Sequence, residues 1–182
     1  MTTIRRRFHA DERGMTMIEL LIAAFLTVLL GAFTMEFYVS QHKAWLVEVE
    51  VSDIQQNARA ALDEIATHMR ICGYHVGAHP AYASGADTVI SYYQNDSTAH
   101  LDTVMFFVDA ADSSRPMLMR RLNAGSAEPF AEFVESMRLT VLTPDLVELS
   151  LTARGEDPDD ELIHGDGYRR RTLTSQVKIR NL

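Results

Sequence analysis

Cysteine, proline and basic residues are scarce in this sequence, and each shortage excludes a class of protein. The one cysteine, Cys72, leaves no intramolecular disulfide framework. Proline does not occur before Pro80, so no proline interrupts a helix in the first part of the chain. The 17 Lys and Arg residues are outnumbered by 25 Asp and Glu, for a formal net charge of −8. No nucleic-acid partner is expected, because contacts to phosphates need clustered basic residues.

The common catalytic motifs are absent as well. The sequence has no phosphate-binding glycine loop, no G-x-S-x-G, no H-E-x-x-H and no C-x-x-C. We therefore expect neither enzymatic activity nor a cofactor. The hydrophobic content of 47% and the charged content of 23% are typical of a folded chain. A length of 182 residues suits one domain plus an extended element.

One long hydrophobic run dominates the N-terminal part of the chain. It extends from Met15 to Val39 and contains only two charged residues, Glu19 and Glu36. At about 1.5 Å per residue, a helix of this length crosses a hydrocarbon core of roughly 30 Å. Residues 1–14 contain four arginines and two acids. This basic start predicts that the N-terminus stays in the cytoplasm and that the remainder lies across the membrane.

A secretory signal and a plain signal anchor are the alternatives for this run. A secretory signal has a shorter hydrophobic region, followed by a small-x-small cleavage site. The run here is longer, and the Ser-Gln-His-Lys of residues 40–43 offers no such site. A plain anchor does not explain Glu19, because a carboxylate inside a membrane helix costs about 2.5–3.5 kcal/mol and usually has a partner.

The residues around Glu19 resemble a known processing site. The string GMTMIEL, residues 14–20, is similar to the prepilin peptidase site of type IV pilins and type II secretion pseudopilins. The resemblance implies that a prepilin peptidase cuts after Gly14 and that the new N-terminal residue, Met15, is methylated. Met15 stands where the family usually has phenylalanine. The resemblance also implies that Glu19 takes part in docking between subunits.

The sequence predicts one helix that continues well beyond the hydrophobic run. Between Met15 and Ile71 there is no proline, and Gly31 is the only glycine. A helix over these residues would measure on the order of 85 Å, with Gly73 as its C-cap. Its second half carries apolar residues at spacings of four and three, which predicts a face that packs on a sheet. These residues are Val47, Val51, Ile54, Ala58, Leu62, Ile65 and Met69.

The rest of the chain has the pattern of short strands separated by turns. Alternation of apolar and polar residues is clearest for Val147, Leu149 and Leu151. The expected strands are Thr88–Tyr93, Thr103–Val108, Met117–Leu122, Met137–Leu142, Leu146–Ala153 and Thr172–Ile179. We therefore predict an α+β, pilin-like fold. Its long N-terminal helix, half membrane-spanning and half amphipathic, packs on one antiparallel β-sheet.

Later segments resemble PilW-type minor pilins. Residues 56–62 and 69–74 are similar to the end of that group's helix, and residues 170–181 are similar to its closing strand. The resemblance implies a minor pilin of a type IV pilus, with other minor pilins and the major pilin as partners. It implies a single-pass protein of the bacterial inner membrane with a periplasmic head, which later enters the pilus filament. A minor pseudopilin of a type II secretion system is the alternative, and a membrane-tethered periplasmic enzyme is a third possibility.

These expectations divide the chain into four segments. Residues 1–14 form the prepilin leader, and residues 15–40 form the half of the helix that crosses the membrane and later lies in the filament core. Residues 41–72 form the amphipathic half of the helix. Residues 73–182 form the periplasmic β-sheet head.

Four side chains of the types that zinc accepts lie close together in the sequence. They are His68, Cys72, His75 and His79. His68 and Cys72 would share one helical face, and the two later histidines could approach from the following loop. The alternative is a small buried cysteine with three unrelated histidines. We favour the alternative and expect no metal here.

An acidic segment, residues 155–167, could instead hold calcium. Its carboxylates are Asp157, Asp159, Asp160, Glu161 and Asp166. Clustered oxygen ligands suit calcium, but their spacing does not match an EF-hand. An acidic loop between two strands is the simpler interpretation. The basic residues 169–171 beside it are expected to balance this loop or to face solvent.

Overall fold

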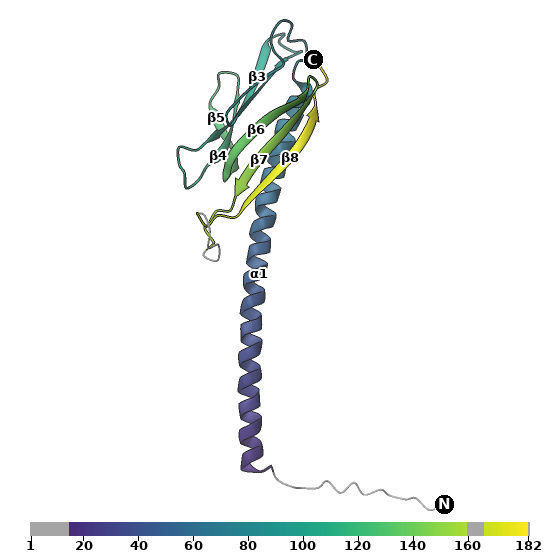
Figure 1. Ribbon diagram of the computed structural model, residues 1–182. Coiled ribbons are helices and arrows are strands. Elements are labelled where there is room, and N and C mark those ends of the chain that lie inside the picture. The colour runs from purple at the N-terminus through teal and green to yellow at the C-terminus, as the bar shows by residue number, and fades with distance from the viewer. Residues whose placement is uncertain (1–14, 160–165, 182) are drawn as a thin grey trace, which may run out of the picture. The chain divides into compact units, whose positions relative to one another are not determined.

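The computed structural model describes residues 15–159 and 166–181 of the chain. In these residues one long helix precedes eight strands (Figure 1). The helix, α1, spans Met17–Ile71, close to the predicted bounds. The strands are β1 (Tyr82–Gly85), β2 (Thr88–Gln94), β3 (Leu101–Asp109), β4 (Met117–Leu122), β5 (Ala127–Glu132), β6 (Val134–Thr143), β7 (Leu146–Arg154) and β8 (Arg170–Lys178). The described chain divides between Leu46 and Val47 into two compact units, and α1 contributes to both.

The strands form two sheets, which corrects the prediction of a single sheet. The first sheet has the order β1-β2-β3-β4-β5 and the second has the order β6-β7-β8, with antiparallel pairing throughout the described strands. The break lies at Phe133, the one residue between β5 and β6. Its φ of 58° lies outside the extended range, so the chain changes direction there. Strand β6 then pairs with β7 and contacts β2, β3 and β4.

The second half of α1 and both sheets share one hydrophobic core. The buried residues of α1 are Ile54, Ala58, Ala61, Leu62, Ile65, Ala66 and Met69. Those of the sheets include Val89, Val104, Phe106, Leu118, Val134, Met137, Val147, Leu149, Leu151, Ala153 and Val177. Figure 1 shows this half of α1 running alongside β6–β8. The predicted packing face is therefore confirmed from Ile54 onward, whereas Val47 and Val51 are only half-buried.

The end of α1 depends on a glycine. Gly73 has a φ of 84°, the left-handed conformation expected of a residue just beyond a helix end. Its N–H donates to the carbonyl oxygen of Tyr92 at 2.9 Å, which ties the helix end to β2. A Cβ at this position would lie 2.0 Å from the carbonyl oxygen of Asn181. The predicted C-cap role of Gly73 is therefore confirmed, and no other residue fits there.

The first half of α1 has a different environment. Every side chain from Met15 to Leu46 is exposed, although most of them are apolar. An 18-residue window within α1 has a mean hydropathy of 2.2, and none of that window is buried. By length and composition, α1 is a helix that can cross a membrane.

Candidate functional site

The first turn of α1 is closed by Thr16 and Glu19. The backbone N–H and the hydroxyl of Thr16 each donate a hydrogen bond to Glu19 Oε2, both at 2.8 Å. The backbone N–H of Glu19 donates in return to Thr16 Oγ1 at 3.3 Å. This reciprocal arrangement is a capping box, which satisfies N–H groups that have no partner inside the helix. Thr16 is thus the N-cap, and Glu19 is the third residue of the helix.

The capping box holds the Glu19 carboxylate one turn from the predicted new N-terminus. Met15 directly precedes the box and is exposed, whereas Gly14 lies outside the described residues. Both hydrogen bonds from Thr16 end on Oε2, and an ionised carboxylate has about four acceptor positions. Glu19 therefore keeps the capacity to accept from an amine at Met15 or on a neighbouring subunit, and that pairing stays a prediction.

The role of Thr16 as the N-cap was not predicted from the sequence. The signal was present, because T-x-x-E immediately before an apolar run is a sequence signature of a helix start. The capping box also gives Glu19 a local structural role. A plain membrane anchor can therefore accommodate this carboxylate. A variant that keeps the cap but removes the charge is needed to separate helix capping from the predicted docking between subunits.

The four candidate zinc ligands do not form a site. Within residues 15–159 and 166–181, no three His, Cys, Asp or Glu side chains are arranged to hold a metal ion. The Cys72 thiol is buried and donates to the carbonyl oxygen of Met69 at 3.0 Å. The rings of His75 and Tyr74 stack with their centres 4.2 Å apart. Burial raises the pKa of Cys72 to about 11, so its thiol stays protonated at neutral pH.

His68 instead lines a cavity between α1 and the five-stranded sheet. This cavity has a volume of about 440 Å³ and is also lined by Tyr93, Arg120 and Glu128. His68 Nε2 lies 3.5 Å from Glu64 Oε1, and the imidazole centre is 5.6 Å from that of the Phe106 ring. Its buried Nδ1 has no hydrogen-bond partner among the described residues. Burial lowers the pKa of His68, although the Glu64 carboxylate opposes this effect.

The acidic segment carries carboxylates that already have basic partners. Asp159 pairs with Arg169, and Asp166 pairs with Arg170. Two of the three basic residues at 169–171 thus balance the acidic segment, as predicted. The candidate calcium ligands Asp160 and Glu161 lie outside the described residues. The described carboxylates alone do not make a metal site.

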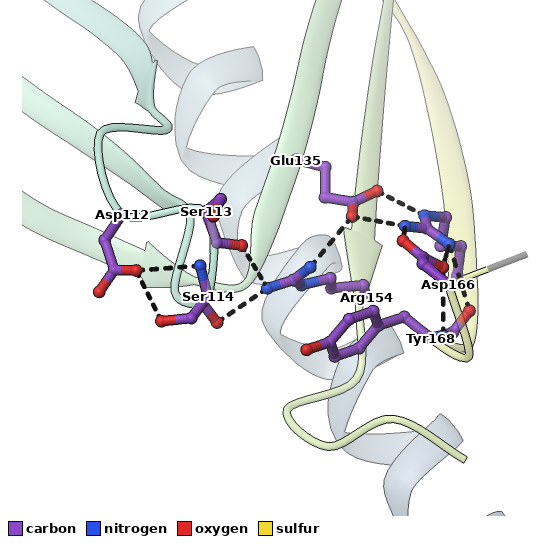
Figure 2. Close-up of polar contacts among 8 residues, drawn as sticks. Asp112, Ser113, Ser114, Glu135, Arg154, Asp166 and Tyr168 are labelled. Carbon is purple, nitrogen blue, oxygen red and sulfur yellow. Dashed lines mark hydrogen bonds and ion pairs between the residues drawn. The ribbon is translucent and has the colours of Figure 1, made fainter. Parts of the chain in front are cut away.

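Arg154, at the end of β7, is the centre of a polar cluster (Figure 2). Only 6% of its surface is exposed. Its Nη2 donates to the carbonyl oxygens of Ser113 and Ser114, both at 2.8 Å, and its Nη1 lies 3.6 Å from Glu135 Oε1. Glu135 also accepts from Arg170 at 2.6 and 2.8 Å. The cluster therefore joins the β3–β4 loop, β6, β7 and the start of β8.

A second carboxylate lies close to this cluster. Glu50 of α1 approaches Gly155 so closely that a Cβ on Gly155 would lie 1.8 Å from Glu50 Oε1. This oxygen is buried and has no hydrogen-bond partner within the described part of the chain. Burial raises the pKa of Glu50, and the positive charge of Arg169 partly opposes the shift. The absence of a side chain at Gly155 is what allows the helix and the end of β7 to approach here.

Two groups of charged residues in the described part of the chain bear most directly on the candidate site. One is the start of α1, with the Thr16–Glu19 capping box in an otherwise apolar segment. The other is the Arg154 cluster, whose contacts all lie within the head and stabilise its fold. Comparison of the chain with protein-family models, with curated proteins and with solved structures gave no match.

Proposed function

We propose that this chain is a minor subunit of a type IV pilus, made as a precursor and assembled into a filament through its N-terminal helix. The observation that supports this most directly is the continuity of α1. Its first half exposes apolar side chains as far as Leu46, and its second half supplies the core of the head from Ile54 to Met69. The first half can therefore exchange lipid for other helices without any change in the head's core.

The proposed mechanism is assembly, not catalysis. The precursor lies in the inner membrane with its leader in the cytoplasm and its head in the periplasm. A prepilin peptidase cuts between Gly14 and Met15, and the new amine at Met15 is methylated. The subunit then leaves the bilayer and packs its apolar half against the stems of other minor pilins and the major pilin. The Glu19 carboxylate pairs with an amine in that bundle, because an unpaired carboxylate there is costly.

The test of this proposal is the mature N-terminus. In a cell with its own prepilin peptidase, mass spectrometry should find a chain that begins at methylated Met15. Gly14→Leu should retain the leader. Gly31→Ala is the matched glycine control and should be processed normally, since a Cβ at Gly31 meets no atom within 4 Å. A wild-type chain that keeps residues 1–14 in such a cell would refute the pilin assignment.

A second experiment separates the pilus from a type II secretion system. Deleting the gene should remove or reduce surface filaments while secreted enzymes still reach the medium. The reverse result, normal filaments with loss of secretion, would make the chain a minor pseudopilin. Processing at Met15 is expected in both cases, so the two experiments answer different questions.

A further inference from the structure

Three rings lie on one face of α1, just beyond its most apolar part. Tyr38, His42 and Trp45 are spaced by four and three residues, which places them on the same side of a helix. The Tyr38 and His42 rings have centres 6.2 Å apart and planes within 1° of parallel. The His42 and Trp45 rings follow at 5.9 Å and 22°. Tyr38 and Trp45 are 64% and 56% exposed, so no part of the described chain covers the stack.

The position of these rings matches one edge of a membrane-spanning segment. No charged residue occurs from Leu20 to Met35, and Glu19 and Glu36 bracket this stretch. The 19 helical steps from Glu19 to Tyr38 correspond to about 28 Å, close to the thickness of a hydrocarbon core of roughly 30 Å. When Tyr38 lies at one edge of the core, Glu19 therefore lies near the other.

Tyrosine, histidine and tryptophan are all suited to such an edge. Each has an apolar ring and a polar tip, so the ring can contact acyl chains while the hydroxyl or N–H reaches water and lipid headgroups. Tyr and Trp are enriched at both surfaces of a membrane for this reason. Tyr38 lies two residues beyond Glu36, and His42 and Trp45 follow within the next two turns. The chain also becomes polar there, at Gln41 and Lys43.

We infer that Tyr38, His42 and Trp45 form an anchor that lies in the lipid headgroup region, in the leaflet opposite the basic leader. The inference rests on the membrane stage of the proposed function and adds the depth at which the helix is held. It also changes the environment assigned to Glu19. With the rings in the headgroup region, Glu19 and its capping box lie near the cytoplasmic edge of the bilayer, where water is close.

The sole tryptophan of the chain makes this inference directly testable, because all indole fluorescence comes from Trp45. The full-length chain is inserted into vesicles of phosphatidylcholine with a minor fraction of phosphatidylglycerol. Quenching is compared for lipids with a nitroxide on the headgroup and lipids with a nitroxide deep in the acyl chain. We expect the headgroup nitroxide to quench Trp45 more strongly, and aqueous iodide to quench it less than it quenches the denatured chain.

A matched pair of variants tests whether the stacked rings set the depth at which α1 lies in the bilayer. Tyr38→Leu removes one polar tip from the stack, whereas Phe37→Leu changes a neighbouring ring on another face of the helix. Tyr38→Leu should weaken the preference of Trp45 for the headgroup nitroxide, and Phe37→Leu should leave it unchanged. An equal response to both variants would show that the stack does not act as the anchor.

The remaining outcomes also give clear answers. If the chain floats with the vesicles but the deep nitroxide quenches Trp45 best, the assigned depth is wrong. If it floats and only iodide quenches Trp45, the rings lie outside the bilayer and the inference is overturned while membrane insertion stands. If quenching of Trp45 by the lipid nitroxides falls as the protein concentration rises, a second copy of the chain covers the stack in place of lipid, and the inference is overturned. A chain that fails to float would refute the membrane stage itself, and the anchor with it.

Discussion

The guanidinium carbon of Arg154 lies 3.9 Å from the centre of the Tyr168 ring. Arg154 directly precedes the acidic segment 155–167, and Tyr168 directly follows it. This contact therefore joins the residues that flank the two ends of the segment (Figure 2). A hydrogen bond from the N–H of Gly155 to the carbonyl oxygen of Arg169 lies beside it at 2.9 Å. The ends of the acidic segment are therefore held by the head, with a buried cation at their centre.

Removing that cation should destabilise the head strongly. In a fragment comprising residues 43–182, Arg154→Ala leaves two carbonyl oxygens and Glu135 without their buried donor. We expect the free energy of unfolding to fall by about 3 kcal/mol or more, as for other broken buried ion pairs. Urea unfolding of the fragment measures this. Arg115→Ala is the control, because its pair with Glu132 is about half exposed and should contribute less than about 1 kcal/mol. Equal losses in the two variants would contradict a structural role for the cluster.

The same fragment tests the packing face of α1. It lacks the exposed apolar half of the helix, so we expect it to be soluble and to unfold in a single cooperative transition. Ile54→Asp and Leu62→Asp each place a carboxylate at a position less than 6% exposed, and each should lower stability by about 3 kcal/mol or more. Gln55→Asp, next to Ile54 but exposed, should change it by less than about 0.5 kcal/mol. An Ile54→Asp fragment with the parent's melting temperature would show that this face is assigned wrongly.

Cys72 should be unreactive in the folded head. Its thiol is fully buried and its pKa is raised to about 11, so little thiolate is present or accessible at pH 8. A thiol reagent such as dithionitrobenzoate should label the fragment only on unfolding in urea. The raised pKa also means that the thiol's contribution to stability is intact below pH 9 and is lost as the pH rises through about 11. Rapid labelling of the folded fragment would show that the end of α1 opens readily.

Glu19 has two possible roles, and two substitutions separate them. Glu19→Ala removes both the cap and the charge, whereas Glu19→Gln removes the charge but can keep the capping box, since Gln also serves at this position. We expect both variants to be inserted and cleaved, and both to lose piliation and co-purification with partner pilins. The reason is that the proposed charge pair in the filament stem needs a carboxylate, which both variants lack.

Thr16→Ala completes this comparison, because it weakens the cap by about 1 kcal/mol and leaves the charge in place. It should still support filaments. Glu36→Ala is a second control, because Glu36 lies at the far end of the uncharged stretch and should affect filament counts less. Normal piliation by Glu19→Gln together with failure of Thr16→Ala would mean that Glu19 acts only by capping the helix.

Much of the head could be predicted because its strands have clear patterns. Strand β4 has the predicted bounds, and Val147, Leu149 and Leu151 all face the core as their alternation indicated. Strand β5 was missed because it contains Pro129 and few strand-favouring residues. It lies at the edge of its sheet, where a proline is tolerated. Strand β1 was missed because its four residues, Tyr-Ala-Ser-Gly, are too short a pattern to recognise.

The division into two sheets could not be predicted, because it depends on one backbone angle. Phe133 adopts a positive φ, which is uncommon for a bulky residue and has no sequence signature. The predicted packing face of α1 was also incomplete, because it left out two buried alanines. Ala61 and Ala66 are fully buried, but alanine is common on both faces of a helix and carries little information about burial. Glu19 was a candidate from the sequence and Thr16 was not, although both belong to one capping box; a role of Glu19 in assembly stays a prediction.

The attachment of the helix end to Asn181 has a consequence for how the chain is made. The side-chain amide of Asn181 donates to the carbonyl oxygen of Ile71 at 3.4 Å, across 110 residues of sequence. At about 5–20 residues per second, a ribosome needs roughly 5–20 s to extend the chain from one to the other. Throughout this interval the apolar face of α1 lacks β8 and the contact that closes the head. The nascent chain thus exposes this apolar face after the segment that can cross a membrane is already complete, and a chaperone that binds apolar surfaces has that interval in which to act.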